Sequence, residues 1–199
     1  KSHHFEKMLY DQALLATVYV DAYRATGDTF YADTAREVLR YVMETLQSED
    51  GGVHSSEDAD SEGEEGKFYT WTVNEMQTLL TSEELKALLV AGGMISKDDS
   101  LDSLSEGDRA GRLVLRLAER PEKLETMRIE GGTVGVLLRS ALGKLGDARA
   151  ARIRPGMDDK IVADWNGLAV KAFARAGRAL GEQRYIDSAV RCAGYVLTE

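Results

Sequence analysis

The sequence predicts an all-α fold built from repeated αα-hairpins, with one short β-hairpin inserted between the copies. Three observations support it: helical periodicity near both ends of the chain, an internal repeat, and a polar central segment that breaks the helical period. The chain has 199 residues, of which 43% are hydrophobic and 30% charged, with only two prolines. This composition is typical of a globular protein and excludes disordered and collagen-like chains.

The first two predicted helices form an αα-hairpin. Apolar residues recur at steps of three and four from Phe5 to Thr26, and Gly27 ends this helix. Asp28 is a good N-cap for a second helix that runs to about Gln47. Two helices joined by so short a Gly-Asp turn make an αα-hairpin.

The same pattern recurs near the C-terminus, where a shift of 154 positions carries residues 14–44 onto 168–198. The shift preserves an Arg-Ala-x-Gly turn, which ends at Gly27 and again at Gly181. It also preserves a Tyr-x-Asp-x-Ala motif, which starts at Tyr31 and again at Tyr185. Unrelated amphipathic helices would share the apolar period but not these turn residues. The αα-hairpin is therefore repeated, and we expect Asp28 and Glu182 to open the second helix of each copy.

Between the copies, we expect a β-hairpin or long structured loop over Val53 to Thr72. Its Gly-rich polar middle is followed by alternating aromatic and β-branched residues from Lys67 to Thr72. A helix from Val73 to about Ala91 then begins with a capping box of Thr72 and Glu75. Gly92 to Gly111 has little pattern. The remaining segments are expected to be helices at Leu113 to Leu117, Glu122 to Arg128 and Thr133 to Leu145 (ended by Gly146), and a non-helical stretch at Arg152 to Asp164.

Charge and apolar patterning exclude several kinds of partner. The net charge of −9 and the absence of a basic stripe disfavour nucleic acid. No apolar run approaches the ~20 residues of a membrane span, and the N-terminus has no signal-peptide core, so we expect a cytoplasmic protein with no membrane partner. Cys192 is the only cysteine, which excludes an intrachain disulfide and a multi-thiolate zinc site, and its helical apolar surroundings predict burial. Because the chain lacks an initiator Met, we expect a piece of something longer.

The first of three polar clusters runs from His3 to Asp11. On the predicted helix, His4, Lys7 and Asp11 share one face, and Glu6 and Tyr10 share an adjacent one. An imidazole, an ammonium and carboxylates on a helix suit proton transfer or polyol binding. The alternative is a solvated helix start with an ordinary salt bridge.

The second cluster is acidic. Its Asp58-x-Asp60-x-Glu62-Gly63 run imitates the opening of a Ca²⁺ loop, but Tyr69 occupies the twelfth position, where such loops have a bidentate Glu, so we predict no metal site. Aromatic residues follow directly, among them Tyr69 and Trp71. Aromatic rings beside carboxylates make a sugar-binding surface, because rings meet C–H faces and carboxylates accept hydroxyl hydrogen bonds. A merely solvated acidic turn is the alternative.

The third cluster lies before and at the start of the second repeat copy. Asp158, Asp159 and Lys160 follow a Pro-Gly turn, and Trp165 and Asn166 open the next helix. The two acids could instead pair with the arginines at 152 and 154. The repeat aligns Trp165-Asn166 with residues 11–12, so both copies bring polar residues to equivalent helix ends, as a closed helical toroid with a site at one mouth would require.

The long motifs of these clusters resemble the spermatogenesis-associated, thioredoxin-domain-containing family. They are His4-Phe5-Glu6-Lys7-Met8-Leu9-Tyr10-Asp11, the run from Asp58 to Trp71, and Arg154 to Lys160 with Trp165-Asn166-Gly167. The resemblance implies a longer protein with an N-terminal thioredoxin-like domain and a C-terminal (α/α)₆ toroid. That toroid is similar to six-hairpin glycosidases and N-acylglucosamine 2-epimerases.

The chain departs from the family pattern. It lacks the thioredoxin-like domain, and its segment from Gly92 to Gly132 looks shortened. A ring of about twelve helices of average length needs more than 199 residues, so we expect a partial ring. We expect its broken edge to self-associate through apolar stripe residues, namely Val38, Val42, Tyr195 or Val196.

Two classes of function follow. The first is a carbohydrate-active toroid, either a sugar epimerase or isomerase using histidine, His54 included, or a glycoside hydrolase using paired carboxylates. The second is a non-catalytic binding or scaffold module that serves a thioredoxin-like domain. Neither requires a cofactor. The candidate catalytic residues, expected to converge on one concave mouth, are His4, Glu6, Asp58, Asp60 and Asp159. The candidate substrate-binding residues are Lys7, Tyr10, Asp11, Glu62, Tyr69, Trp71, Asp158, Lys160, Trp165 and Asn166.

Overall fold

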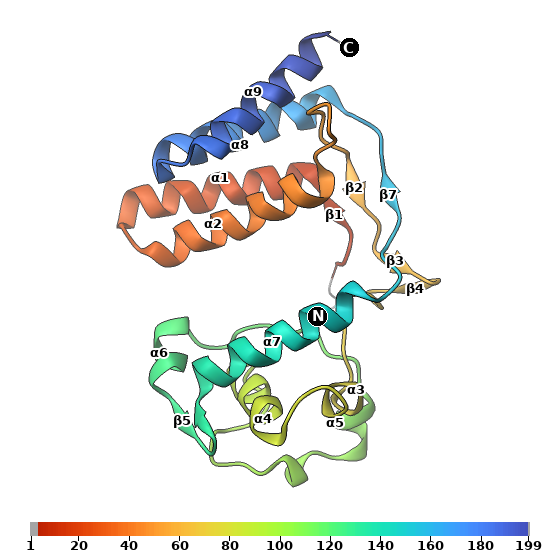
Figure 1. Cartoon of the computed structure of the whole chain (residues 1–199), viewed down its shortest axis with the longest axis vertical. Helices are drawn as coiled ribbons and strands as arrows, with labels where there is room; N and C mark the ends of the chain where they lie inside the picture. Colours follow the sequence, from red (N-terminus) through yellow and green to blue (C-terminus); the bar gives the residue numbers. More distant parts are fainter. Residues whose placement is uncertain (1–3, 199) are drawn as a thin grey trace. The chain divides into compact units, whose positions relative to one another are not determined.

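The computed structural model describes residues 4–198, which divide into two units. Unit 1 combines the residues up to Asp60 with those from Pro155 onward, and unit 2 is Ser61–Arg154. The described residues are mainly helical with short strands, as predicted (Figure 1). His3 lies outside the described residues.

Two αα-hairpins form the body of unit 1. Hairpin 1 is α1 (Leu9–Thr26) and α2 (Thr29–Tyr41), and a π-helical turn (Val42–Leu46) continues α2. Hairpin 2 is α8 (Ala163–Leu180) and α9 (Gln183–Thr198). Helix α1 packs against both α2 and α8, and α8 packs against α9 (Figure 1).

The repeat predicted from the sequence is confirmed in the helix bounds. The shift of 154 positions carries both ends of α1 onto the ends of α8, and the start of α2 onto the start of α9. The Asp28 carboxylate accepts a hydrogen bond from the Phe30 N–H at 3.0 Å, which confirms the predicted N-cap. Glu182 stands directly before α9, at the position that Asp28 holds before α2.

The core of unit 1 is the seam between the hairpins. Phe173 and Tyr185 are fully buried there, with small residues such as Ala16 and Ala172 between the helices. Cys192 is also fully buried, as predicted, and burial raises the pKa of its thiol to about 11.

A three-stranded antiparallel sheet brings distant segments of unit 1 together. Strand β2 (Ser56–Glu57) is central, with β1 (Lys7–Met8) on one side and β7 (Met157–Asp158) on the other. In register, Met8 lies opposite Ser56, which lies opposite Asp158. The sheet overturns the prediction of a helix from Phe5, because backbone pairing with β2 keeps Lys7–Met8 extended and α1 begins only at Leu9.

The predicted β-hairpin is present but short. Strand β3 (Asp60–Ser61) pairs with β4 (Glu64–Glu65), and the turn between them places Glu62 and Gly63 at φ of 55° and 77°. The alternating residues from Lys67 to Thr72 form no strand, in agreement with the structured-loop alternative. This segment forms tight turns in which the Tyr69 and Thr70 N–H groups donate to the Gly66 carbonyl, and Trp71 is buried.

Unit 2 has its own core, in which α4 (Ser82–Ala91) packs against α7 (Val134–Ala150). The capping box of Thr72 and Glu75 is confirmed, but a second one, Thr81 with Glu84, restarts the helix where a single helix was expected. The remaining elements of unit 2 are α3 (Val73–Gln77), a 3₁₀ turn (Leu101–Ser103), α5 (Glu106–Ala110), α6 (Pro121–Thr126), β5 (Arg128–Ile129) and β6 (Gly132–Thr133).

Two further expectations in unit 2 are wrong. The segment from Leu113 to Leu117 is not a helix, because Leu113 exchanges backbone hydrogen bonds with Trp71 at 3.1 and 2.7 Å, which keep it extended. Gly146 does not end α7, which continues to Ala150. A glycine at negative φ lowers helix propensity but does not by itself end a helix.

Candidate functional site

The sheet of unit 1 collects polar side chains on one face. Directly opposed residues of an antiparallel pair point to the same face, and residues two apart on a strand do likewise. The register therefore places Ser56 and Asp158 on one face together with Glu6 and Asp58, which extend the strands by one step. The Ser56 hydroxyl lies 3.5 Å from Oε1 of Glu6, in agreement with this placement.

These side chains line an acidic groove of about 280 Å³, which we call the sheet groove. Three carboxylates, Glu6, Asp58 and Asp158, come from three segments that lie far apart in the sequence. Glu6 and Asp58 are exposed to solvent, and Asp158 is partly buried. The lining of the sheet groove is Glu6, Ser56, Asp58, Gly156, Met157 and Asp158.

Backbone hydrogen bonds hold the groove in shape. The Asp58 N–H donates to the Gly156 carbonyl at 2.8 Å, and the Ser55 N–H and hydroxyl both donate to the Asp158 carbonyl at 3.1 Å. On the opposite face of β2, Glu57 is fully buried and accepts a hydrogen bond from the Tyr41 hydroxyl at 2.8 Å. This hydrogen bond links β2, the central strand of the groove, to the end of α2 in hairpin 1.

Asp158 has a fixed cationic neighbour. Lys160 Nζ lies 2.7 Å from its Oδ2, and the Lys160 backbone N–H lies 3.3 Å from its Oδ1. The hydrogen bond from Lys160 lowers the pKa of the Asp158 carboxyl. The ion pair with Lys160 thus favours the ionised form of Asp158.

Aromatic and amide side chains stand at the adjoining helix starts. Tyr10 in α1 and Trp165 in α8 meet edge to face, with ring centroids 5.0 Å apart. Asn166 is fully buried, and its amide pairs with both the N–H and the carbonyl of Val53 at 2.9 Å. This bidentate contact fastens α8 to the segment that leads into β2.

The structure brings together only part of the predicted catalytic set. Glu6 and Asp58 line the sheet groove, together with Asp158, which had been predicted to bind substrate. Asp60 and Asp159 are exposed residues of unit 1 outside the groove lining, and the carbonyl of Asp159 lies 3.1 Å from Nδ1 of His54. The exposed His4 precedes β1 and does not line the groove.

The remaining predicted binding residues fall into two groups. In unit 1, Asp11 is exposed on the first turn of α1, and Lys7 reaches the Phe5 carbonyl at 3.4 Å instead of sharing a helix face with Asp11. Glu62, Tyr69 and Trp71 belong to unit 2. There Glu62 pairs with Lys67 at 3.1 Å, Tyr69 meets Phe68 edge to face, and Trp71 is covered by the Arg152 guanidinium 3.7 Å from its ring.

Sequence reasoning missed Ser56 and Met157 as groove residues. The alternation of Ser56 with Asp58 indicated that these two side chains share one face of a strand. Only the pairing of β2 with β1 and β7 shows that Glu6 and Asp158 lie on the same face. Among the described residues, no three His, Cys, Asp or Glu side chains are grouped so as to hold a metal ion. No helix within residues 4–198 is long and apolar enough to cross a membrane.

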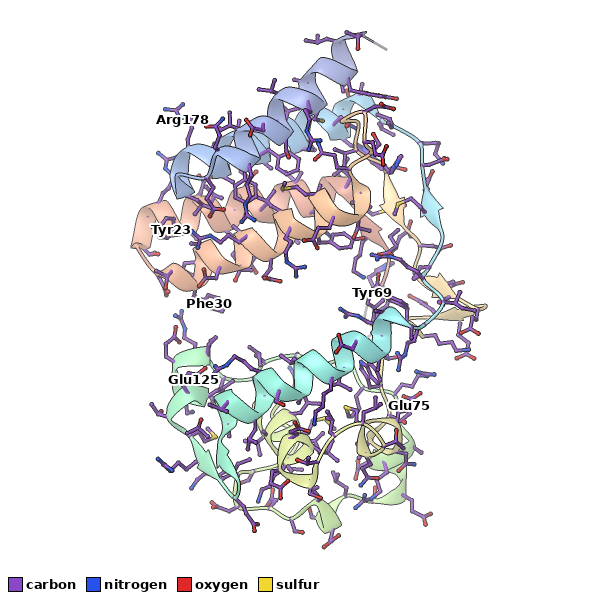
Figure 2. The ribbon with its side chains drawn as sticks, in the orientation of Figure 1. Tyr23, Phe30, Tyr69, Glu75, Glu125 and Arg178 are labelled. Atoms are coloured by element: carbon purple, nitrogen blue, oxygen red, sulfur yellow. The ribbon has the colours of Figure 1, made fainter. Side chains whose placement is uncertain are left out.

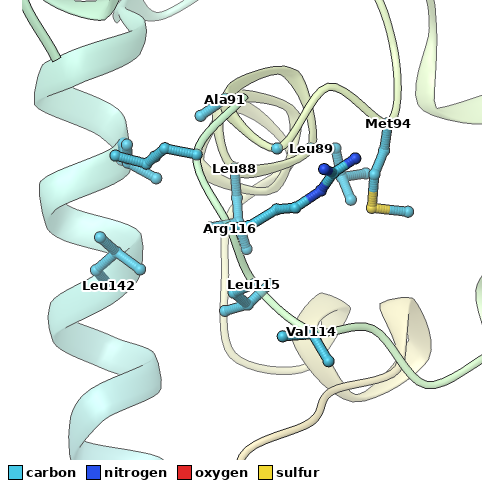
Figure 3. A pocket seen from close by; sticks show the side chains of 11 residues that line it. Leu88, Leu89, Ala91, Met94, Val114, Leu115, Arg116 and Leu142 are labelled. Carbon is cyan, nitrogen blue, oxygen red and sulfur yellow. The ribbon is translucent and has the colours of Figure 1, made fainter. Parts of the chain in front are cut away.

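Unit 2 contains a cavity of a different chemical kind. Aliphatic side chains of α4 and α7 and of the segment 114–117 enclose about 260 Å³, and the Arg116 side chain lies among them (Figure 3). Met94 and Leu142 line it as well, and it contains no carboxylate, thiol or imidazole. The sheet groove is therefore better suited to acid–base chemistry and to polar ligands.

Comparisons with known proteins bear on ancestry more than on chemistry. No family model matches the chain. Among solved structures, a glycoside hydrolase family 76 enzyme (mannosidase) from Bacteroides thetaiotaomicron aligns with 96% of this chain and 44% of its own, at 15% identity and a TM-score of 0.28. At that score the likeness carries no argument.

The sequence relatives are much closer. Alignments of 211 residues that cover 97% of this chain show 39% identity to spermatogenesis-associated protein 20 of Homo sapiens and 30% identity to an uncharacterized protein of Caenorhabditis elegans. The chain spans 27% and 29% of the lengths of these proteins. Over nearly its whole length, the chain is thus homologous to about a quarter of spermatogenesis-associated protein 20.

Proposed function

We propose that unit 1 is part of a carbohydrate-active α/α toroid and that its sheet groove binds a neutral sugar. The observation that carries the proposal is the convergence of Glu6, Asp58 and Asp158 on one groove. Carboxylates are strong acceptors for sugar hydroxyl groups, and the Ser56 hydroxyl adds a group that both donates and accepts. A groove of about 280 Å³ is large enough for a single sugar ring.

Among the carbohydrate reactions, the groove favours glycoside hydrolysis over epimerisation. Epimerisation by histidine needs an imidazole at the reacting carbon, and neither His4 nor His54 lines the groove. Hydrolysis needs one protonated and one ionised carboxyl group on either side of the glycosidic bond. Asp158, whose ionised form Lys160 favours, suits the ionised role, and we propose Glu6 or Asp58, the other carboxyl groups of the groove, for the role of the acid.

A non-catalytic binding role is the second candidate, and exposed apolar residues favour it. Leu14, Leu15 and Val18 of α1 are 48%, 45% and 62% exposed, which is unusual for neighbouring large apolar side chains. Such a face suits contact with another protein domain. Of the residues expected from the sequence to mediate self-association, Val42 is buried and Val38 packs against the core of unit 1, which leaves the partly exposed Tyr195 and Val196 for that contact.

Sugar binding tests the leading proposal directly. A glycan array identifies a ligand, and calorimetry then compares the protein with its Asp58→Asn and Glu6→Gln variants. We expect both variants to weaken binding about tenfold or more, because each loses a charged acceptor in the groove. Asp60→Asn is the matched control, since Asp60 is an exposed acid two residues away and outside the groove lining. Absence of any sugar ligand, or equal losses in Asp58→Asn and Asp60→Asn, would contradict the proposal.

Release of reducing sugar from the bound glycan then separates the two classes of function. Hydrolysis that is lost in Asp158→Asn supports an enzyme. Binding without turnover, together with capture of a protein domain that depends on Val18, supports the non-catalytic module.

A further inference from the structure

A second cavity in unit 1 is lined by cations. It lies at the C-terminal ends of α1 and α8 and has a volume of about 330 Å³. Three arginines line it together with Ala179: Arg24 from the last turn of α1, and Arg175 and Arg178 from the last turns of α8. Figure 2 labels Arg178 and Tyr23 at this end of the hairpins. We call this cavity the arginine pocket.

The arginine pocket carries excess positive charge in an acidic protein. Two of its three guanidinium groups contact one carboxylate, Asp21, which pairs with Arg175 and lies 3.8 Å from Nη1 of Arg24. Within the part of the chain that the structure describes, Arg178 has neither a hydrogen-bond nor an ion-pair partner. Around the pocket the balance is thus two positive charges, whereas the whole chain has a net charge of −9.

One donor of the pocket is unsatisfied. Nε of Arg175 is buried and has no hydrogen-bond partner among the described residues. A buried donor without an acceptor is unfavourable, more so for a charged group, so such groups are rare. The unpaired donor belongs to the residue that also contacts Asp21.

Helix electrostatics alone does not explain this arrangement. Cations are favoured in the last turn of any helix, because the carbonyl groups there carry partial negative charge. That accounts for Arg24 and Arg178 taken one at a time. It does not account for three guanidinium groups around one cavity or for a buried Nε with no acceptor.

We propose that the arginine pocket binds a phosphate group, either inorganic phosphate or the phosphoryl group of a small molecule. A phosphate carries about −1.5 to −2 charges at pH 7, which matches the two uncompensated arginines. Guanidinium groups bind phosphate oxygens through paired N–H donors, and three such groups line the pocket.

This site is distinct from the sheet groove. The groove adjoins the first residues of α1 and α8, and the arginines stand in the last turns of the same helices. Helices of 18 residues are roughly 27 Å long. Phosphate binding therefore does not depend on the proposed sugar site.

Titration calorimetry with inorganic phosphate, at constant ionic strength set by chloride, tests the proposal. We expect saturable binding that weakens about tenfold or more in Arg178→Gln, because one charged donor is lost. Asp21→Asn should instead strengthen binding, since it removes the carboxylate that competes for Arg175. Arg40→Gln is the matched control, because Arg40 is an exposed arginine of α2 that pairs with Glu37 and Glu44 outside the pocket.

Each outcome of these titrations either supports or contradicts phosphate binding. Absence of saturable binding, or equal losses in Arg178→Gln and Arg40→Gln, would overturn the proposal, and so would weaker binding in Asp21→Asn. Circular dichroism confirms that each variant is folded. A parallel titration with glycerol phosphate shows whether a phosphomonoester or the free anion binds more tightly. Asp58→Asn should leave phosphate affinity unchanged, so failure of the sugar proposal and failure of this one are distinguishable.

Discussion

Hairpins 1 and 2 of unit 1 have the same backbone plan but differ in the side chains that fill it. In both, the first helix spans 18 residues and ends at a glycine with φ of 71°, Gly27 or Gly181. The Arg-Ala-x-Gly turn keeps this left-handed cap, a conformation that glycine adopts without steric cost. The repeated turn residues therefore determine the common helix lengths.

Aligned positions nevertheless carry complementary residues. Asp21 and Arg175 occupy the same place in the repeat and form an ion pair with each other across the hairpins. Where hairpin 1 has Tyr23 and Ala32, hairpin 2 has Gly177 and Ile186, so that a large and a small residue have changed places. A Cβ atom at Gly177 would lie 2.5 Å from Cδ1 of Ile186, which shows how closely α8 and α9 approach there. Divergence between the copies thus provides an ion pair between them and a close helix contact within hairpin 2.

The largest expected difference concerns two equivalent tyrosines. Tyr185 is fully buried and Tyr31 is only half-buried, although both come from the same repeat motif. We expect Tyr185→Ala to lower the free energy of unfolding by about 3–5 kcal/mol, because it leaves a large cavity in the core. Tyr31→Ala should cost clearly less. Urea denaturation followed by circular dichroism measures both, and equal losses would show that the hairpins are buried alike.

The next largest difference in stability is expected between residues at the starts of α8 and α1. Asn166→Ala removes the amide that pairs with the buried N–H and carbonyl of Val53, so we expect a loss of about 2–4 kcal/mol. The aligned residue of hairpin 1 is Gln12, which is partly exposed, and Gln12→Ala should change stability by no more than about 0.5 kcal/mol. The same denaturation experiment compares them. A small effect of Asn166→Ala would mean that water replaces the amide.

The close approach of α8 and α9 gives a smaller effect. Gly177→Ala should destabilise the protein by about 1–3 kcal/mol, since the new methyl group overlaps Ile186. Gly194→Ala in α9 is the control. Its Cβ meets open space, and alanine should stabilise the helix by about 0.5–1 kcal/mol. Thermal unfolding of the two variants should shift in opposite directions, and a shift in the same direction would refute close packing at Gly177.

The ion pair between the hairpins should contribute least. Asp21 is 46% exposed and Arg175 37% exposed, so we expect Asp21→Asn to cost at most about 1 kcal/mol at low salt. The loss should shrink in high salt, because exposed charges are screened. Unfolding measured at two ionic strengths tests this expectation. A large loss that is independent of salt would indicate that Asp21 acts through packing.

Local signals in the sequence located the hairpins well. The Asp28 cap, the Gly27 and Gly181 stops and the Thr72–Glu75 capping box depend on residues a few positions apart, and each is present as expected. Errors arose where local signals competed. Thr81 and Glu84 formed a second capping box inside a segment expected to be one helix, and Leu113 paired with Trp71 in an extended conformation.

The candidate site was likewise only partly predictable from the sequence. The sequence identified Glu6, Asp58 and Asp158 as acids in unusual clusters, together with the repeat that carries the helices. It could not show that Lys7–Met8 would leave the helical pattern to join a sheet, because that choice depends on pairing with β2, about 50 residues away. Pairing of β1, β2 and β7 alone decided which acids face one groove and left Asp60 and Asp159 outside it. The arginine pocket likewise arises only when α1 and α8 pack together, since its charges come from residues about 150 positions apart whose spacing along the chain gives no sign of contact.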